Sequence, residues 1–352
     1  MNYIQIITQY SGRALFAFCL SFLLVVLALM IYPKLGLMDR PSKYGIKRKP
    51  IPYYGGLVIF LAFAISVMKF VDMSDQVIGL MIGAGIIVLT GFLDDYFNLN
   101  PFVRLFAQFA AAVLLVHFGI VIFSVNVPFI GVISFSHPVL YGVAVLSAAF
   151  TVVWVMTIVN VMNFLDGVSG LSSGVTFIAG LTLFLLSIHP GIHNNPASQV
   201  NVATIALIIS MVSLGFLIFD FPQPKILMGD TGSTFLGYIL ATLAIFTGGK
   251  VATAFLVLGI PILDMVWVVL RRIFSRQPFW RGDLKHLHHR LLDFGMKPWI
   301  VVVIYLTVSA IFGFTAVMLV SGQQKFFMVI ALVILMLLLS SALVFLPNKK
   351  GS

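Results

Sequence analysis

The sequence predicts an all-α polytopic membrane protein, organised as a single domain over residues 1–352 with about eleven transmembrane helices. Three observations lead to this prediction. Hydrophobic residue types make up 61% of the chain and charged types only 9%, whereas soluble globular domains contain roughly 45–50% and 25%. The mean hydropathy is +1.11. Apolar stretches recur along the chain, each near the roughly 20 residues that cross a bilayer as a helix. This composition excludes a soluble enzyme, a disordered chain and a nucleic-acid-binding domain.

We expect each apolar span to be a helix, because backbone groups cannot stay unpaired in lipid and the spans are too long for barrel strands. The predicted spans are residues 14–32, 53–71, 76–93, 103–124, 138–159, 168–188, 199–219, 233–249, 251–270, 299–320 and 326–346. Residues 125–137 alternate loosely and are too short to cross, which predicts a small external β-hairpin. Pro261 predicts a kink inside its helix.

The basic residues predict the orientation of the chain. Of the 21 lysines and arginines, all except Arg13, Lys69, Lys250 and Lys325 fall at one face of the predicted bundle. The positive-inside rule assigns that face to the cytoplasm, with the N-terminus outside and the C-terminus inside. Most aspartates fall at the same face, so we expect the chemistry to face the cytoplasm.

Asp94 and Asp95 stand side by side at the end of the third span. Two adjacent carboxylates at the lipid boundary repel each other and lose hydration, and a divalent cation such as Mg²⁺ would relieve both effects. The alternative is a pair of solvated aspartates that simply ends a helix.

Polar side chains recur at every third position of the next cytoplasmic loop, at Asn160, Asn163, Asp166 and Ser169. On a helical turn they would form one stripe, and the neighbouring glycines would let a ligand approach the backbone. Amides, a carboxylate and a hydroxyl between two apolar spans favour a binding role over a packing role.

The segment from Lys225 to Thr234 contains the run Gly-Asp-Thr-Gly-Ser at the start of an apolar span. Free N–H groups at the start of a helix bind phosphate, and Asp230 is placed to bind a metal. Such short runs are common, so this motif supports a phosphate or metal site only in combination with the other motifs.

The longest cytoplasmic loop, residues 271–298, contains His286, His288, His289 and Arg290 among further basic residues. One interpretation is a juxtamembrane segment attracted to anionic lipid. A zinc site is poorly supplied, because the chain has one Cys and no Glu. Protonated or hydrogen-bonding histidines beside basic residues suit a diphosphate better.

Together these loops indicate phosphoryl transfer assisted by Mg²⁺, with Mn²⁺ as the second choice, between a soluble nucleotide substrate and a molecule held in the membrane. The rival interpretations are a secondary transporter and an inactive relative with a structural role. Transporter sites tend to lie near the midplane between repeated halves, whereas these acids gather at one face and no repeat is visible.

Five motifs in a fixed order carry a resemblance to a known family. They are Asp94-Asp95, Asn160–Leu171, Lys225–Gly232, Pro261–Asp264 and His286–Arg290. The chain resembles the bacterial polyprenyl-phosphate N-acetylhexosamine-1-phosphate transferases of glycosyltransferase family 4, and more distantly the phospho-MurNAc-pentapeptide transferases. The resemblance implies transfer of an N-acetylhexosamine 1-phosphate, with GlcNAc favoured, from a UDP-sugar to undecaprenyl phosphate. The resemblance further implies that UMP is the leaving group. It also implies that the reaction is the first membrane step of cell-envelope polysaccharide synthesis and takes place in the bacterial cytoplasmic membrane.

The resemblance also implies residue roles and partners. The catalytic residues would be Asp94, Asp95, Asp166 and His288, and the Mg²⁺ ligands Asn163 and Asp230. The substrate-binding residues would be Asn160, Ser169, Lys225, His286, His289 and Arg290. The implied partners are a UDP-N-acetylhexosamine, a polyprenyl phosphate and the bilayer, with no nucleic acid, and a homodimer is left open.

Several positions depart from the family pattern. Ser169 stands where an Asp is usual, Asn98 replaces the last Asp of an Asp-Asp-x-x-Asp motif, and residues 44–47 replace Arg-Lys-x-His. The His-Leu-His-His-Arg run looks like the N-acetylhexosamine group, since the pentapeptide transferases typically show three consecutive histidines followed by Phe-Glu. The MurNAc-pentapeptide substrate therefore stays the alternative.

Overall fold

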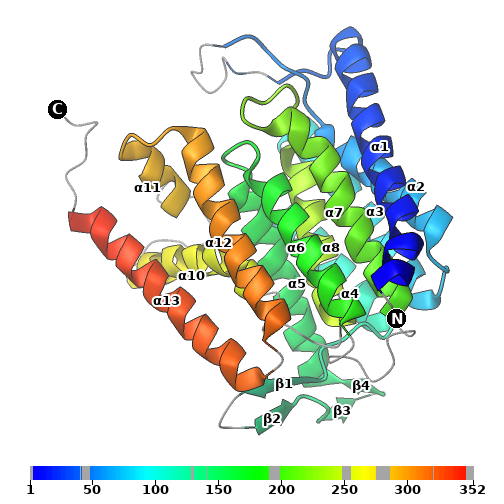
Figure 1. Cartoon of the computed structure of the whole chain (residues 1–352), viewed down its shortest axis with the longest axis vertical. Coiled ribbons are helices and arrows are strands. Elements are labelled where there is room, and N and C mark those ends of the chain that lie inside the picture. The colour runs from blue at the N-terminus through cyan, green and yellow to red at the C-terminus, as the bar shows by residue number, and fades with distance from the viewer. Residues whose placement is uncertain are drawn as a thin grey trace.

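The computed structural model describes residues 3–39, 41, 48–127, 131–140, 142–189, 199–247, 255–274, 286–319 and 321–345 (Figure 1). The helices are α1 Tyr3–Leu35, α2 Gly55–Phe70, α3 Asp75–Phe97, α4 Pro101–His117, α5 Val145–Leu165, α6 Leu171–Ile188, α7 Val200–Asp220, α8 Gly229–Phe246, α10 Gly259–Phe274, α11 Leu287–Asp293, α12 Pro298–Met318 and α13 Gly322–Phe345. The strands are β1 Ser124–Val127, β2 Gly131–Ser134, β3 Val139–Leu140 and β4 Val143–Ala144.

Each predicted apolar span overlaps a helix within the described residues, which confirms an all-α membrane protein. Within the described residues, 6 helices are long and apolar enough to cross a membrane, namely α1, α3, α5, α6, α7 and α12. Helices α2 and α4 and the first part of α13 are shorter and apolar. Eleven crossings therefore stay a prediction. The short helix α11 lies inside the predicted loop 271–298.

Two helix boundaries differ from the predicted spans around the strands. Helix α4 ends at His117 instead of residue 124, and Gly119 follows with a φ of +76° that does not continue a helix. Helix α5 begins only at Val145, after the strands β3 and β4. It continues to Leu165, so Asn160 and Asn163 lie on a helix and not in the predicted loop.

The strands lie at one end of the helical bundle. Strands β1 and β2 pair antiparallel, with Val125 opposite Ile133, inside the segment predicted to form a hairpin. Figure 1 shows the strands at the same end as the N-terminal end of α1, while the C-terminal end of α1 and α11 lie at the other. This arrangement agrees with the predicted topology, and the assignment of either end to the cytoplasm stays a prediction.

Among the candidate spans, α6 and α7 are the most buried and α1 is the least buried. Helix α7 packs against α6 and α1, and α8 packs against α2, α3 and α5. The apolar side chains of α8 are nearly all buried, so its N-terminal end is held on several sides. The ends of α3, α5 and α8 away from the strands meet the start of α4, and this meeting point positions the site described below.

Pro261 marks a helix interruption close to where the sequence predicts a kink. Residues 255–257 are helical, Leu258 is a turn residue, and α10 begins at Gly259. A proline has no N–H to donate to the residue four positions earlier, which explains an interruption just before it. Several charged residues whose membrane face the sequence predicts lie outside the described residues: Arg40, Lys43, Lys47, Lys250, Arg276, Arg281, Asp283, Lys285, Lys349 and Lys350.

Candidate active site

Helices α3, α4, α5 and α8 enclose a cavity of about 310 Å³. Four of the residues that the sequence singled out line this cavity, namely Asp94, Asn160, Asn163 and Asp230. They come from three segments that are far apart in the sequence. The structure therefore brings the Asp pair, the Asn stripe and the Gly-Asp turn to one place.

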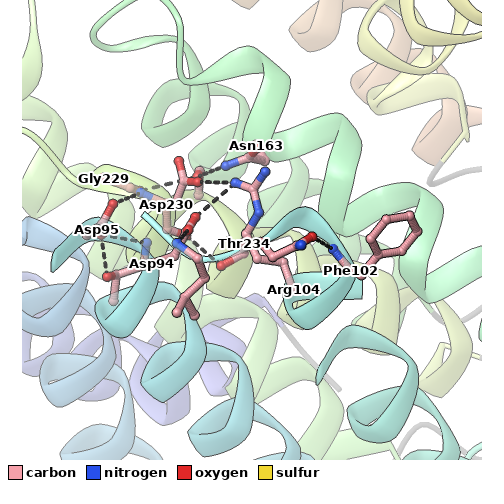
Figure 2. Close-up of polar contacts among 12 residues, drawn as sticks. Asp94, Asp95, Phe102, Arg104, Asn163, Gly229, Asp230 and Thr234 are labelled. Atoms are coloured by element: carbon pink, nitrogen blue, oxygen red, sulfur yellow. Dashed lines mark hydrogen bonds and ion pairs between the residues drawn. The ribbon is translucent and has the colours of Figure 1, made fainter. Parts of the chain in front are cut away.

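Arg104 holds the two carboxylates of the cavity together (Figure 2). Its Nη1 atom donates to Asp94 Oδ2 and to Asp230 Oδ2, each at 2.9 Å. The other oxygen of Asp94 accepts from the backbone N–H of Leu99 at 2.8 Å. The two carboxylates can approach one ligand from α3 and α8, with a guanidinium beside them.

Asp95 points away from Asp94 and does not line the cavity. Its carboxylate accepts hydrogen bonds from the N–H groups of Asp230 and Thr231 at 2.9 and 3.0 Å and from Thr231 Oγ1 at 2.6 Å. The hydroxyl of Tyr53 donates to it at 3.0 Å. The two neighbouring aspartates therefore have different surroundings.

The amides of the predicted stripe face α4 and α8. Asn160 donates to Gln108 Oε1 on α4 and to the carbonyl of Met156, both at 2.7 Å. Asn163 donates to Ser233 Oγ on α8 at 3.1 Å, which leaves its amide oxygen available to a ligand.

Asp166 and Ser169 lie in the turn between α5 and α6, beside the cavity and not in its wall. Asp220, at the end of α7, anchors this turn by accepting from the N–H of Gly170 at 2.9 Å and from Ser173 Oγ at 2.6 Å. Burial, together with the negative charges of Asp220, Asp230 and Asp95, raises the pKa of Asp166 well above its ordinary value. The site thus holds more carboxylates than one arginine can balance.

Phe164 lines the cavity and also lines a second, small pocket together with His286 and His288. His286 pairs with Asp264 through Nδ1 at 3.0 Å and stacks on Phe164. Both ring nitrogens of His288 are buried without a hydrogen-bond partner within the described residues. Nε2 of His288 and of His289 lies near the position a Cβ would take at Gly167, 3.1 and 3.4 Å away. The cluster thus touches the Asp166 turn and stays outside the cavity.

Lys225 and Arg290 also lie outside the cavity wall. Lys225 is exposed, and its ammonium sits 5.9 Å from the ring centre of Phe219. Arg290 is half-buried in the last turn of α11. Their predicted substrate-binding roles stay predictions.

Sequence reasoning missed three polar residues of this region: Arg104, Gln108 and Tyr53. From the sequence, Arg104 contributes only to the predicted topology, although a lone basic residue ten positions after Asp94 is a possible partner for it. Gln108 follows one helical turn later on the same side of α4. Nothing in the spacing of Tyr53 connects it to Asp95.

The donor set of the cavity fits a hard cation such as Mg²⁺. Within the described residues, no group of three or more His, Cys, Asp or Glu side chains is arranged to hold a metal ion by itself. Mg²⁺ needs only one or two carboxylates, because water and substrate phosphates complete its octahedron. Asp230, with the amide oxygen of Asn163 nearby, supplies that kind of incomplete oxygen site.

Comparison with known proteins identifies the family. The model for glycosyl transferase family 4 matches residues 77–248, which include every residue that lines the cavity. A Bacillus subtilis (strain 168) protein named "Probable undecaprenyl-phosphate N-acetylglucosaminyl 1-phosphate transferase" is 31% identical over 88% of this chain and 86% of its own length. The chain belongs to glycosyl transferase family 4.

Two further relatives have related names. The Mycobacterium tuberculosis (strain ATCC 25618 / H37Rv) "Decaprenyl-phosphate N-acetylglucosaminephosphotransferase" is 28% identical over 80% of this chain and 76% of its own length. The Staphylococcus carnosus (strain TM300) "Phospho-N-acetylmuramoyl-pentapeptide-transferase" is 27% identical over 85% of this chain and 96% of its own length.

Proposed function

We propose that this protein transfers N-acetylglucosamine 1-phosphate from UDP-GlcNAc to undecaprenyl phosphate in the bacterial cytoplasmic membrane. An oxygen of the lipid phosphate attacks the sugar-side phosphorus of the donor. The bond from that phosphorus to the oxygen bridging to UMP breaks, UMP leaves, and a lipid diphosphate sugar remains in the membrane. The similarity to the Bacillus subtilis protein over 88% of the chain is the observation that carries this proposal.

The cavity geometry supports the same reaction. A carboxylate and an amide from two helices converge on one space, as a diphosphate with its cation requires. Bound Mg²⁺ would offset the charge of the diphosphate and polarise the phosphorus that is attacked. Asp230 and Asn163 would hold it. Arg104 offers its guanidinium to the lipid phosphate, and Asp94 orients that guanidinium.

The remaining roles fall to the Asp166 turn and to the histidines, which lie outside the cavity wall. The Asp166 turn lies at the nucleotide end, and the histidines that touch Gly167 lie near the sugar or diphosphate. We place these groups, with the C-terminus, on the cytoplasmic side, since most of the lysines and arginines are predicted to lie at that face. The name of the Staphylococcus carnosus relative favours a MurNAc-pentapeptide substrate as the second candidate.

The experiment is an assay of purified protein in nanodiscs with undecaprenyl phosphate, MgCl₂ and either UDP-GlcNAc or UDP-MurNAc-pentapeptide. With UDP-GlcNAc as the donor, we expect release of UMP and formation of a lipid diphosphate GlcNAc, identified by mass spectrometry. With UDP-MurNAc-pentapeptide as the donor, we expect neither product. Chelation of the metal by EDTA should stop the release. A product only from the pentapeptide donor would favour the second candidate, and no UMP from either donor would contradict both.

A further inference from the structure

We propose that Asp95 is a positioning residue, which caps the N-terminus of α8 from its place on α3 and thereby fixes Asp230. The hydroxyl of Tyr53 donates a further hydrogen bond to the carboxylate of Asp95. The assignment of Asp230 to the reaction rests on the proposed function. The capping itself rests only on contacts within the described residues. The two adjacent aspartates, which the sequence treats as one catalytic pair, would then have separate tasks.

The hydrogen bonds of Asp95 fill both of its carboxylate oxygens. Oδ1 accepts from Tyr53 Oη at 3.0 Å and from the N–H of Asp230 at 2.9 Å. Oδ2 accepts from the N–H of Thr231 at 3.0 Å and from its Oγ1 at 2.6 Å. A carboxylate offers about four lone-pair sites. Asp95 therefore has no lone pair left for a cation or for a proton from substrate.

Helix α8 needs such a partner, because it has no cap of its own. The first N–H groups of a helix have no acceptor within the helix. The residue at the N-cap position is Met228, whose side chain makes no capping hydrogen bond. Asp95 supplies the missing acceptors to Asp230 and Thr231. Its negative charge also lies at the positive end of the helix dipole.

The packing at this point is built for close approach. A Cβ atom at Gly229 would lie 2.6 Å from Asp95 Oδ2, and Gly229 has a φ of +71°. On α3, a Cβ atom at Gly91 would lie 2.6 Å from Thr231 Cα. The two glycines thus allow the end of α3 and the start of α8 to pack in direct contact.

The hydroxyl of Tyr53 stays protonated and able to donate, because burial and the Asp95 charge raise the pKa of Tyr53.

Asp94 provides the contrast. It lines the cavity, and its partners are the N–H of Leu99 and the partly exposed guanidinium of Arg104, which lines the cavity too. It makes no hydrogen bond to the backbone of α8 within the described residues.

An Asp95→Asn variant separates the two tasks. The amide has one oxygen and one NH₂ group, and in either orientation the NH₂ faces one of the two backbone N–H groups that Asp95 now accepts. The hydroxyls of Tyr53 and Thr231 can turn and accept instead, but a backbone N–H cannot. One N–H at the start of α8 is therefore left without an acceptor in either orientation.

The test is hydrogen–deuterium exchange, read by mass spectrometry on peptides that cover residues 226–236, without substrate. We expect Asp95→Asn to speed exchange in this segment on the order of tenfold, as the loss of one buried hydrogen bond does. Asp94→Asn, one residue away, should leave the segment unchanged. Unchanged exchange in Asp95→Asn, or equal acceleration throughout the protein, would overturn the proposal.

Two further variants keep the test decisive if Asp95→Asn does not fold. Tyr53→Phe and Thr231→Val each remove one hydroxyl donor from Asp95 and should speed exchange in the same segment less than Asp95→Asn does. Tyr96→Phe is the matched control, because Tyr96 is exposed next to Asp95 in the sequence. Equal exchange in Tyr53→Phe, Thr231→Val and wild-type protein would contradict the capping role.

Kinetics add a second measurement, whose result would not change if Asp95 only capped the helix and had no effect on Asp230. In the UMP-release assay we expect the half-saturating Mg²⁺ concentration of Asp95→Asn to rise about tenfold, with little change in the KM for undecaprenyl phosphate. An unchanged Mg²⁺ dependence would remove the link to Asp230. If wild-type protein releases no UMP, the proposed function fails, while the exchange experiment still decides the capping role.

Discussion

At the scale of single residues, His288 shows how burial selects a protonation state. Its side chain is 1% exposed. Burial first, and then the neighbouring His289 and His286, lowers its pKa to about 3. Of the two forms that the sequence left open, the structure therefore favours a neutral His288 over a protonated one. A neutral ring can still donate or accept one hydrogen bond toward a diphosphate.

This lowered pKa predicts how stability depends on pH. Between about pH 3 and pH 6.5 the unfolded chain binds a proton at this position and the folded chain does not, so acid destabilises the fold by about 1.4 kcal/mol per pH unit for this group. The loss begins as the pH falls below the unfolded value. We expect the melting temperature in detergent to fall more between pH 7.5 and 5 in wild-type protein than in His288→Asn. Equal falls would contradict a neutral His288.

Asn98 explains one departure from the family pattern in conformational terms. It ends α3 in the left-handed region, with φ 53° and ψ 71°, and its N–H donates to the carbonyl of Asp94 at 2.7 Å. Asn tolerates this conformation better than most residues. A helix-ending role therefore accounts for this position without a catalytic one.

At the scale of elements, the turn between α5 and α6 depends on the end of α7. Asp220 is 3% exposed, and one of its oxygens, Oδ2, accepts both from Gly170 and from Ser173. This anchor holds the turn that carries Asp166 and Ser169. The arrangement predicts that the oxygen matters more than the charge, because a single acceptor atom makes both bonds.

We therefore expect Asp220→Ala to raise the KM for UDP-GlcNAc about tenfold, as the turn loses two hydrogen bonds, with little change in the KM for the lipid phosphate. Asp220→Asn keeps one oxygen and should stay near wild type. Ser173→Ala removes one of the two bonds and should fall between them. If Asp220→Asn proved as damaging as Asp220→Ala, the negative charge and not the hydrogen bonds would be responsible.

At the scale of the whole molecule, α3 carries acids at both of its ends. The helix has 23 residues, a length of about 35 Å that matches a bilayer. Asp75 lies in its first turn and Asp94 in its last. These two acids therefore lie about one bilayer thickness apart, and the predicted topology assigns them to opposite faces of the membrane.

This separation predicts a sharp difference between the faces. Asp94→Asn and Asp230→Asn should each lower UMP release at least about a hundredfold, as the loss of a catalytic charge does. Asp72→Asn and Asp75→Asn, at the other end of α3, should leave it within about twofold. Size-exclusion chromatography in detergent checks that all four variants fold. An outer-face variant as inactive as Asp230→Asn would mean that the assigned topology is wrong.

The sequence alone determined the class of fold and the motifs of the site. Apolar spans of bilayer length leave the backbone little choice except helices, so each predicted span overlaps a helix within the described residues. The convergence of Asp94, Asn163 and Asp230 could also be anticipated, because polar residues at one face of a bundle have few other places to lie.

Only the tertiary structure decided which side chains touch. Spacing along the chain could not separate Asp94 from Asp95, yet a helix turns by about 100° per residue, so neighbours face different elements. One carboxylate therefore meets Arg104 in the cavity, and the other meets the start of α8. Likewise, Asp220 is separated from Gly170 by 50 positions in the sequence, and Tyr53 from Asp95 by 42. Local sequence patterns carry no information about contacts between residues so far apart in the chain.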